Sequence, residues 1–402
     1  MPRRALVAVE PAHAVVRVGD EDRRDSRTEG AWKAVERLYE AGLHPAIALH
    51  VVHRGRVLLD RTIGHLANAP GAAAGPVATP DSLFSLFSGS KIVTAALVHA
   101  LVDDGLLSLD KPVADYIPAF AQHGKHTITL RHLLSHTAGI PDMPPGLDAV
   151  GLLRRGEAPV AEICALRPLT PPGERVAYHP MTAWFLLQRI LEDVAGTPLR
   201  PLLRRRLLDP LGIENLGYGV DPSRVAEVAL HAITGPPAPG VMTRIFERSI
   251  GVDLDTAVRV SNEPAFLAAT LPSANVIGKP REMSRFLEML RLGGTLDGVR
   301  VLSESAVQSM VTPATPRQFD ATFGFPMRYG LGVMMGGRRF SLYGLNTPGA
   351  FGHLGLSNVV VYADPARQLS VSFLNTGKPM MDHDMLRWYW VLQRIVSVFP
   401  RR

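Results

Sequence analysis

Ser88 and Lys91 are the side chains in this 402-residue sequence whose types and spacing point most directly to chemistry. They stand three residues apart in Ser88-Gly89-Ser90-Lys91, where a helix is expected to begin. Residues at this spacing share one face of a helix, so the Lys91 nitrogen can reach the Ser88 hydroxyl. A serine hydroxyl becomes a nucleophile when a neighbouring base takes its proton. Burial and the positive end of the helix dipole both favour a neutral amine, and the same helix end offers backbone N–H groups to an oxyanion.

A second Ser-x-x-Lys match, Ser108 and Lys111, stands in surroundings that do not suit this chemistry. Pro112 follows Lys111 directly and disfavours a helix there. Ser88 instead precedes a run with helical periodicity. Because so short a pattern also arises by chance, a helix N-cap without catalytic function is the alternative interpretation of Ser88.

The elements that must position Ser88 come from three parts of the chain. Helical patterns separated by Pro- and Gly-rich loops fill the middle, at residues 89–104, 130–136, 181–195 and 199–208. The first part predicts a helix at 29–42 and a hairpin of strands at 46–53 and 57–64. The last part predicts a helix at 281–293, strands at 329–335, 340–345, 358–362 and 369–375, and a final helix at 385–398.

An α+β fold follows from this arrangement. An isolated hairpin is marginal in water, so strands from both ends should join in one antiparallel sheet flanked by the terminal helices. Residues 1–26 are expected to form an N-terminal extension and 27–402 the catalytic domain. Within that domain we expect an α/β lobe from 27–80 and 275–402, and a helical lobe from 81–274.

Composition excludes several classes of protein. A hydrophobic fraction of 46% with 20% charged residues is that of a globular chain, and no apolar run reaches the roughly 20 residues needed to span a bilayer. The single cysteine, Cys164, excludes an intramolecular disulfide, and a cytoplasmic location is expected. The net charge is +6, but the arginines are scattered, so no nucleic-acid partner is expected. His132 and His136 lack an evident third ligand, so no metal or other cofactor is expected.

Three blocks of sequence resemble the serine β-lactamase and penicillin-binding-protein-like family. They are Phe87 to Lys91, Leu106 to Val113, and Ile128 to Ile140, which reads ITLRHLLSHTAGI. The order of these blocks is far more specific than Ser-x-x-Lys alone, and the resemblance covers about residues 30–395. It is closest to the class C branch, which includes the family VIII carboxylesterases. The resemblance implies an antiparallel sheet and a helical lobe with the active site between them.

The family's second motif, Tyr-x-Asn, corresponds to Tyr178-His179-Pro180, 90 residues after Ser88. By resemblance Tyr178 acts with Lys91 as general base, since a phenol near a lysine can have a lowered pKa. Pro180 replaces the Asn and removes its side-chain amide. His179 of this motif is a candidate for substrate binding. Asn275, in the Ser-x-Asn sequence Ser273-Ala274-Asn275, is another. A half-buried aromatic with a packing role is the alternative for Tyr178.

The third motif, Lys-Thr-Gly, corresponds to His353-Leu354-Gly355. The resemblance pairs the backbone N–H of Leu356 with that of Ser88 as the oxyanion hole. Gly355 allows close approach to substrate, and His353 stands where the family has a permanent positive charge. A strand histidine bonded to backbone is the alternative for His353.

Together these motifs predict a serine hydrolase that cleaves small-molecule carboxylic esters through an acyl-enzyme on Ser88. The losses at Pro180 and His353 both remove groups that recognise amide and carboxylate, which disfavours β-lactams. A β-lactamase or D-amino-acid peptidase, an acyltransferase, and a non-catalytic binding protein remain alternatives. An arginine such as Arg328 could restore recognition of a carboxylate. The oligomeric state is not predicted.

Overall fold

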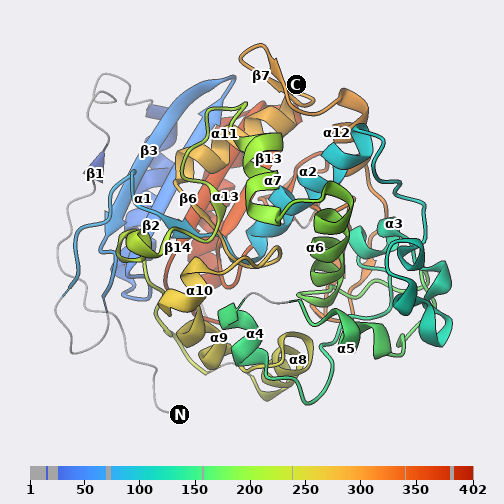
Figure 1. Cartoon of the computed structure of the whole chain (residues 1–402). Helices are drawn as coiled ribbons and strands as arrows, with labels where there is room; N and C mark the ends of the chain where they lie inside the picture. Colours follow the sequence, from blue (N-terminus) through green and yellow to red (C-terminus); the bar gives the residue numbers. More distant parts are fainter. Residues whose placement is uncertain are drawn as a thin grey trace.

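The computed structural model describes residues 15–16, 26–68, 74–155, 158–237, 239–339, 341–380 and 384–401. Most of the expected extension at 1–26 lies outside these residues. Figure 1 shows a sheet built from the blue and red ends of the chain, with green and yellow helices beside it.

A seven-stranded sheet joins both ends of the chain, as predicted. Each strand pairs antiparallel with its neighbours. In pairing order the strands are β1 (Val15–Val16), β3 (Arg56–Gly64), β2 (Ala46–His53), β14 (Leu369–Asn375), β13 (Val360–Asp364), β12 (Phe351–Leu354) and β11 (Met334–Met335). β1 shows that part of the predicted extension belongs to the sheet.

The central strands are covered on both faces. Every residue of β2 is buried, and its side chains alternate between two cores. Ile47, Leu49 and Val51 pack with α1 (Ser26–Glu40) and α13 (Asp384–Val398). Ala46 and Ala48 belong to the other core, with α11 (Pro280–Arg291). Helices therefore lie on both faces of the sheet (Figure 1).

The other described helices and short strands lie mostly in the middle of the chain. The helices are α2 (Ser90–Asp103), α3 (Leu130–Leu134), α4 (Ala149–Arg155), α5 (Val160–Ala165), α6 (Thr182–Ala195), α7 (Leu199–Leu203), α8 (Gly240–Ile250), α9 (Leu254–Ser261), α10 (Pro264–Ala268) and α12 (Glu304–Val311). A three-stranded sheet is formed by β4 (Phe84–Ser85), β6 (Val276–Gly278) and β5 (Gly217–Tyr218). Two small hairpins are β7 (Thr295–Leu296) with β8 (Val299–Arg300), and β9 (Gln318–Phe319) with β10 (Pro326–Met327).

Two predicted strands and one predicted helix differ from the structure. The strand expected at 329–335 is reduced to β11, because Gly332 adopts a φ of +94° and interrupts extended backbone. The strand expected at 340–345 is replaced, over 341–345, by a turn in which Gly344 has a φ of +92°. The helix expected at 199–208 changes after α7 into a π-helical turn, η5 (Arg204–Leu208).

None of the described helices is both long enough and apolar enough to span a membrane.

Gly352 in β12 lies where the sheet is tightly packed, so a substitution there tests this packing. A Cβ atom at this position would lie 2.1 Å from the Val361 carbonyl oxygen of β13. We expect Gly352→Ala to lower the free energy of unfolding by about 1–3 kcal/mol, measured by urea titration followed by circular dichroism.

Gly30→Ala is the matched control, because a Cβ atom at Gly30 in α1 meets nothing within 4 Å. This variant should raise the free energy of unfolding by about 0.5–1 kcal/mol, since alanine is the better helix former. A Gly352→Ala protein as stable as the wild type would show that β12 and β13 are less closely packed than described.

Candidate active site

Ser88 lies on a sharp turn between β4 and α2. The turn is a 3₁₀ segment, η2 (Phe87–Gly89), and Phe87 adopts a left-handed φ of +45°. Ser90 holds the turn: its Oγ donates to the Phe87 carbonyl at 2.5 Å and accepts from the Val276 N–H at 2.8 Å. Ser88 itself stays half-buried at the start of α2, so its hydroxyl is presented from a fixed backbone.

Lys91 is fully buried beside the nucleophile. Its Nζ lies 3.0 Å from Ser88 Oγ and donates to the Ser273 carbonyl, also at 3.0 Å. The aromatic rings of Tyr178 and Trp184 lie 5.2 and 5.5 Å from Nζ. Within the described ranges no carboxylate forms an ion pair with Lys91. Burial therefore lowers the pKa of Lys91 well below its usual 10.5, toward a neutral amine.

Tyr178 borders the same site, and its backbone is held by a buried carboxylate. The Tyr178 N–H donates to Asp320 Oδ1 at 3.2 Å, and Asp320 Oδ2 accepts from the Tyr329 hydroxyl at 2.8 Å. The Tyr178 ring packs 4.7 Å from the rings of His136 and Phe323. These contacts place a buried phenol beside Ser88 and Lys91.

The expectation of a lowered pKa for Tyr178 is wrong for the free enzyme. Burial raises the pKa of its hydroxyl above the usual 10, although the neighbouring Ser88 hydroxyl acts in the opposite direction. Tyr178 is consequently a neutral phenol at physiological pH and a proton donor, while Lys91 is the group whose pKa falls.

His353 lies on β12, buried and bonded to backbone. Its Nδ1 donates to the Leu354 carbonyl at 2.6 Å, since a carbonyl can only accept, so Nε2 is left as an acceptor. Its ring lies 5.9 Å from that of Tyr178. Burial lowers the pKa of His353 to about 3. The position of the family's lysine is thus occupied by an uncharged ring.

The segment after β12 approaches the nucleophile turn closely. A Cβ atom at Gly355 would lie 2.4 Å from the Leu86 carbonyl oxygen, so only glycine fits there. The N–H of Gly355 donates to the Val359 carbonyl at 2.8 Å, whereas in the described part of the chain the N–H of Leu356 donates to no backbone carbonyl. Leu356 is half-buried, and its N–H remains the predicted partner of Ser88 N–H in the oxyanion hole.

Two residues that sequence reasoning missed shape this segment. Ser357 and Asn358 adopt left-handed φ values of +50° and +70°. Ser357 Oγ donates to the Pro379 carbonyl, and the Asn358 carbonyl accepts from Asn375 Nδ2 at 2.7 Å and Trp388 Nε1 at 2.5 Å. A Ser-Asn pair after a glycine was the available signal, because Asn tolerates left-handed backbone.

Lys378 and His231 were also missed, and both lie against Phe87. Lys378 is fully buried, donates to the Asn375 carbonyl at 3.0 Å, and lies 5.0 Å from the Phe87 ring centre. The ring of His231 lies 4.5 Å from that of Phe87. Burial lowers the pKa of each group. Residues 375–379 therefore contact the Ser88 turn on one side and the Leu356 segment on the other.

The substrate-binding roles predicted for His179 and Asn275 do not fit their contacts. His179 is buried, and its Nε2 accepts from the Ile140 N–H at 3.1 Å. Asn275 Nδ2 donates to the Phe266 and Ala269 carbonyls at 3.0 and 2.6 Å. Both side chains bind backbone groups of neighbouring loops. Of the Ser273-Ala274-Asn275 segment, it is the Ser273 carbonyl that contacts Lys91.

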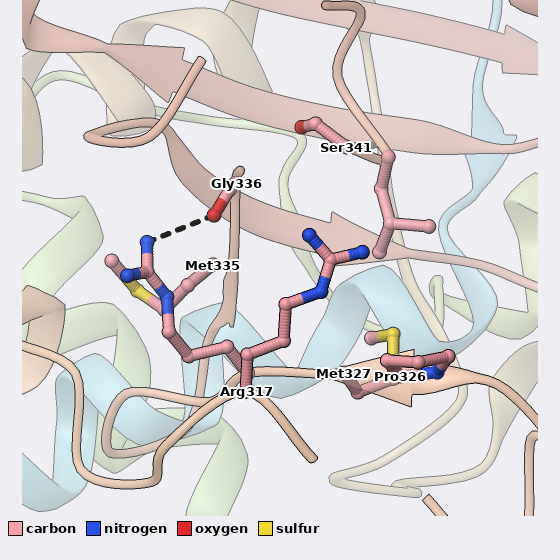
Figure 2. A pocket seen from close by; sticks show the side chains of 8 residues that line it. Arg317, Pro326, Met327, Met335, Gly336 and Ser341 are labelled. Atoms are coloured by element: carbon pink, nitrogen blue, oxygen red, sulfur yellow. Dashed lines mark hydrogen bonds between the residues drawn. The ribbon is translucent and has the colours of Figure 1, made fainter. Parts of the chain in front are cut away.

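Arg328 lines a different hollow, beside β11, with an empty volume of about 260 Å³ (Figure 2). Its Nη2 donates to the Gly336 and Pro348 carbonyls at 2.8 and 2.7 Å, and the dashed line in Figure 2 marks the first of these bonds. Neither Ser88 nor His353 lines this hollow. The Arg328 guanidinium is thus hydrogen-bonded to backbone carbonyls and does not replace the lysine that the family has at the position of His353.

No group of three or more His, Cys, Asp or Glu side chains suited to a metal ion is found among the described residues. His132 Nδ1 instead accepts from the Thr129 N–H at 3.1 Å, and the His136 ring packs among aromatic rings.

Comparison with known proteins agrees with this geometry. Residues 33–394 match the family model described as Beta-lactamase. The chain is 30% identical over 307 residues to Esterase/beta-lactamase LipL of Mycobacterium tuberculosis, covering 71% of this chain and 67% of that protein. It is 29% identical over 281 residues to Esterase EstB of Burkholderia gladioli, covering 63% of this chain and 67% of that protein.

Solved structures share the fold along almost the whole chain. A penicillin-binding protein homologue from Caulobacter crescentus has a TM-score of 0.79 at 25% identity, with 97% of this chain and 100% of that chain covered. A family VIII carboxylesterase has a TM-score of 0.78 at 23% identity, with 96% and 100% covered. The chain therefore belongs to the beta-lactamase family and is a serine hydrolase.

Proposed function

We propose that this protein is a carboxylesterase that cleaves small neutral esters through an acyl-enzyme on Ser88. The observation that carries the proposal is the 3.0 Å contact between Ser88 Oγ and a fully buried Lys91 Nζ. A lysine kept neutral in this way can accept the hydroxyl proton. Small-molecule esters are the proposed partners, with no nucleic acid and no cofactor, and a cytoplasmic location stays a prediction.

Acylation begins when Lys91 takes the Ser88 proton and Ser88 Oγ bonds to the ester carbonyl carbon. The carbonyl oxygen becomes an oxyanion, which the backbone N–H groups of Ser88 and Leu356 stabilise. Tyr178, a neutral phenol, gives its proton to the departing alkoxide, and the proton held by Lys91 restores the phenol. The C–O bond of the ester breaks and the alcohol leaves.

Deacylation uses the same groups with water as nucleophile. The water gives a proton to Lys91 and its oxygen bonds to the acyl carbon, forming a second oxyanion at the same two N–H groups. The bond between Ser88 Oγ and the acyl carbon breaks as Tyr178 gives its proton to Ser88 Oγ, the acid leaves, and the proton held by Lys91 restores the phenol. Proton transfer of this kind typically contributes 10²- to 10⁴-fold.

The site favours esters over β-lactams because two recognition groups are absent. Pro180 offers no side-chain amide, and His353, with its pKa lowered to about 3 by burial, offers no positive charge at neutral pH. An ester without a carboxylate needs neither group. The name of one relative, Esterase EstB, supports this choice, while the name of Esterase/beta-lactamase LipL includes both activities.

An acyltransferase on the same machinery is the second candidate. One structural relative, EstCE1, is described as a hydrolase with promiscuous acyltransferase activity, although its 19% identity shows a shared fold alone. Acyl transfer would occur if an alcohol, in place of water, attacked the acyl-enzyme. Analysis of the products formed in the presence of added alcohol distinguishes hydrolysis from acyl transfer.

The nucleophile can be tested by covalent labelling. A fluorophosphonate should add to Ser88, and mass spectrometry should find the adduct on the peptide that contains Ser88-Gly89-Ser90-Lys91. Ser88→Ala should lose labelling and hydrolysis while keeping its fold by circular dichroism. Ser108→Ala, at the other Ser-x-x-Lys match, is the control and should behave as wild type; an adduct on Ser108 would refute the assignment.

Tyr178→Phe tests the proton donor, because it keeps the ring and removes only the hydroxyl. We expect kcat for p-nitrophenyl butyrate to fall about 10²- to 10⁴-fold with little change in KM. Tyr343→Phe, another buried tyrosine, is the control for loss of a buried hydroxyl, and should leave kcat within a few-fold. A fall of less than about threefold in Tyr178→Phe would mean that this residue only packs.

His353 sets the predicted substrate preference. A missing charge-assisted hydrogen bond costs about 1.5–3 kcal/mol. The absence of the amide at Pro180 adds to this cost for a β-lactam. We therefore expect kcat/KM for p-nitrophenyl butyrate to exceed that for nitrocefin or benzylpenicillin by at least about 100-fold. His353→Lys should narrow this ratio.

The same ratio should not depend on pH in the range where most histidines titrate. Because the pKa of His353 is lowered to about 3, the ring stays uncharged from about pH 5.5 to 8, and the ratio should stay constant there. A ratio that narrows on acidification to pH 5.5, or comparable wild-type rates on both substrate classes, would contradict the account of His353.

A further inference from the structure

Three large apolar side chains are exposed on α13. Met385, Leu386 and Trp390 are 39, 71 and 46% exposed. Leu345, 46% exposed, lies beside them, since its N–H donates to Gln393 Oε1 at 2.9 Å. We call these four side chains the α13 patch. The opposite face of the helix, with Trp388, Val391, Leu392 and Ile395, packs on the sheet.

Several exposed arginines lie on α13 or near its C-terminal end. Arg387 and Arg394 are exposed on the helix, and the Arg394 guanidinium lies 4.7 Å from the Trp390 ring centre. Arg401 follows the helix and donates to Asn346 Oδ1 at 3.0 Å. The Asn346 N–H donates to the Arg338 carbonyl at 3.0 Å, which brings exposed Arg338 and its neighbour Arg339 to the same side.

Apart from Arg387, these arginines form no ion pair with an acid among the described residues. Asp384, the sole acid of α13, is buried: its Oδ2 is bonded to His44 Nε2 at 2.8 Å, and its Oδ1 lies 3.9 Å from Arg387 Nη1. Residues 341–349 carry no acid. The adjacent helix α1 is balanced on its outer positions, with Lys33 and Arg37 against Glu36 and Glu40. Nearby Asp364 is buried and paired with Arg367 at 2.8 Å.

We propose that the α13 patch docks on an anionic lipid surface. Trp, Leu and Met partition into the boundary between lipid headgroups and acyl chains, while arginines around them contact lipid phosphates. Each arginine near an anionic surface contributes about 1 kcal/mol. This docking is peripheral, and it holds whether or not the proposed esterase activity is correct.

Charge favours this occupant over a second copy of the chain. A two-fold symmetric contact places the same patch on both sides, and Arg394 of one copy would then face that of the other, while Asp384, the sole acid of α13, is already paired with Arg387. An anionic bilayer removes that conflict and also covers the apolar side chains. The geometry therefore points to lipid.

Vesicle co-sedimentation of the full chain tests the proposal. Vesicles of phosphatidylcholine with about 30% phosphatidylglycerol should bind the wild type at low salt, and pure phosphatidylcholine vesicles should bind it much more weakly. Arg387→Gln with Arg394→Gln should weaken binding by roughly fivefold for each arginine and reduce its salt dependence. Leu386→Ser with Trp390→Ser should weaken binding to both kinds of vesicle.

Matched controls come from the helical middle of the chain. Leu169 is 64% exposed and Arg189 is exposed on α6, so Leu169→Ser and Arg189→Gln should bind vesicles as wild type. All variants should hydrolyse p-nitrophenyl butyrate at the wild-type rate without vesicles, which separates failure of docking from failure of the proposed activity. Absence of wild-type binding to anionic vesicles would overturn the proposal. So would control variants that lose as much binding as the patch variants, or a concentration-dependent self-association removed by Leu386→Ser.

Discussion

Lys91 is buried, with no carboxylate paired to it in the described part of the chain, and this is the constraint on which the rest of the site depends. An ammonium group taken out of water costs several kcal/mol unless a counter-charge compensates it. Around Lys91 the structure supplies the Ser273 carbonyl and two aromatic rings, and its burial lowers the pKa of the amine. This environment requires α2 to run through the core, and nearly every residue from Ser90 to Leu101 is indeed buried.

Burial also indicates which side chain accepts a proton and which donates one. Burial acts in opposite directions on an amine and a phenol: it lowers the pKa of Lys91 and raises that of Tyr178. Lys91 is thereby suited to accept a proton and Tyr178 to donate one. The proposed backbone donors are held separately, because residues 375–379 contact both the Phe87 side of the Ser88 turn and the segment that contains Leu356. The proposed catalytic side chains and the proposed oxyanion donors are thus positioned by different parts of the fold.

Local patterns predicted most of the architecture, and long-range contacts account for what they missed. The hairpin of β2 and β3, the helix α6 and the strand β14 were predicted within a residue or so, because periodicity and turn residues are local. The strand expected at 329–335 shortened because the left-handed Gly332 is a conformational choice that apolar alternation does not reveal.

Motif positions predicted Ser88, Lys91, Tyr178 and His353 as site residues, and the structure brings them together, but the motifs could not assign protonation. Whether Tyr178 or Lys91 has the lowered pKa depends on burial, which is a property of the folded chain. Lys378, His231 and Asn375 were missed for a related reason, since their contacts with Phe87 and Asn358 join segments far apart in sequence. His179 and Asn275 were overassigned because proximity to a motif in sequence does not fix where a side chain points.

The pH dependence of the acylation burst with p-nitrophenyl butyrate is the most direct test of a neutral Lys91. Stopped-flow measurement of the wild type should give a burst rate that rises with pH along one ionisation well below 10.5, as expected for a buried amine. Tyr178→Phe should keep this acid limb at a lower rate, while Lys91→Arg, which cannot lose its proton, should give no burst. A burst rate that keeps rising to a midpoint near the ordinary lysine pKa would show that Lys91 is an ammonium at neutral pH, and would contradict the account.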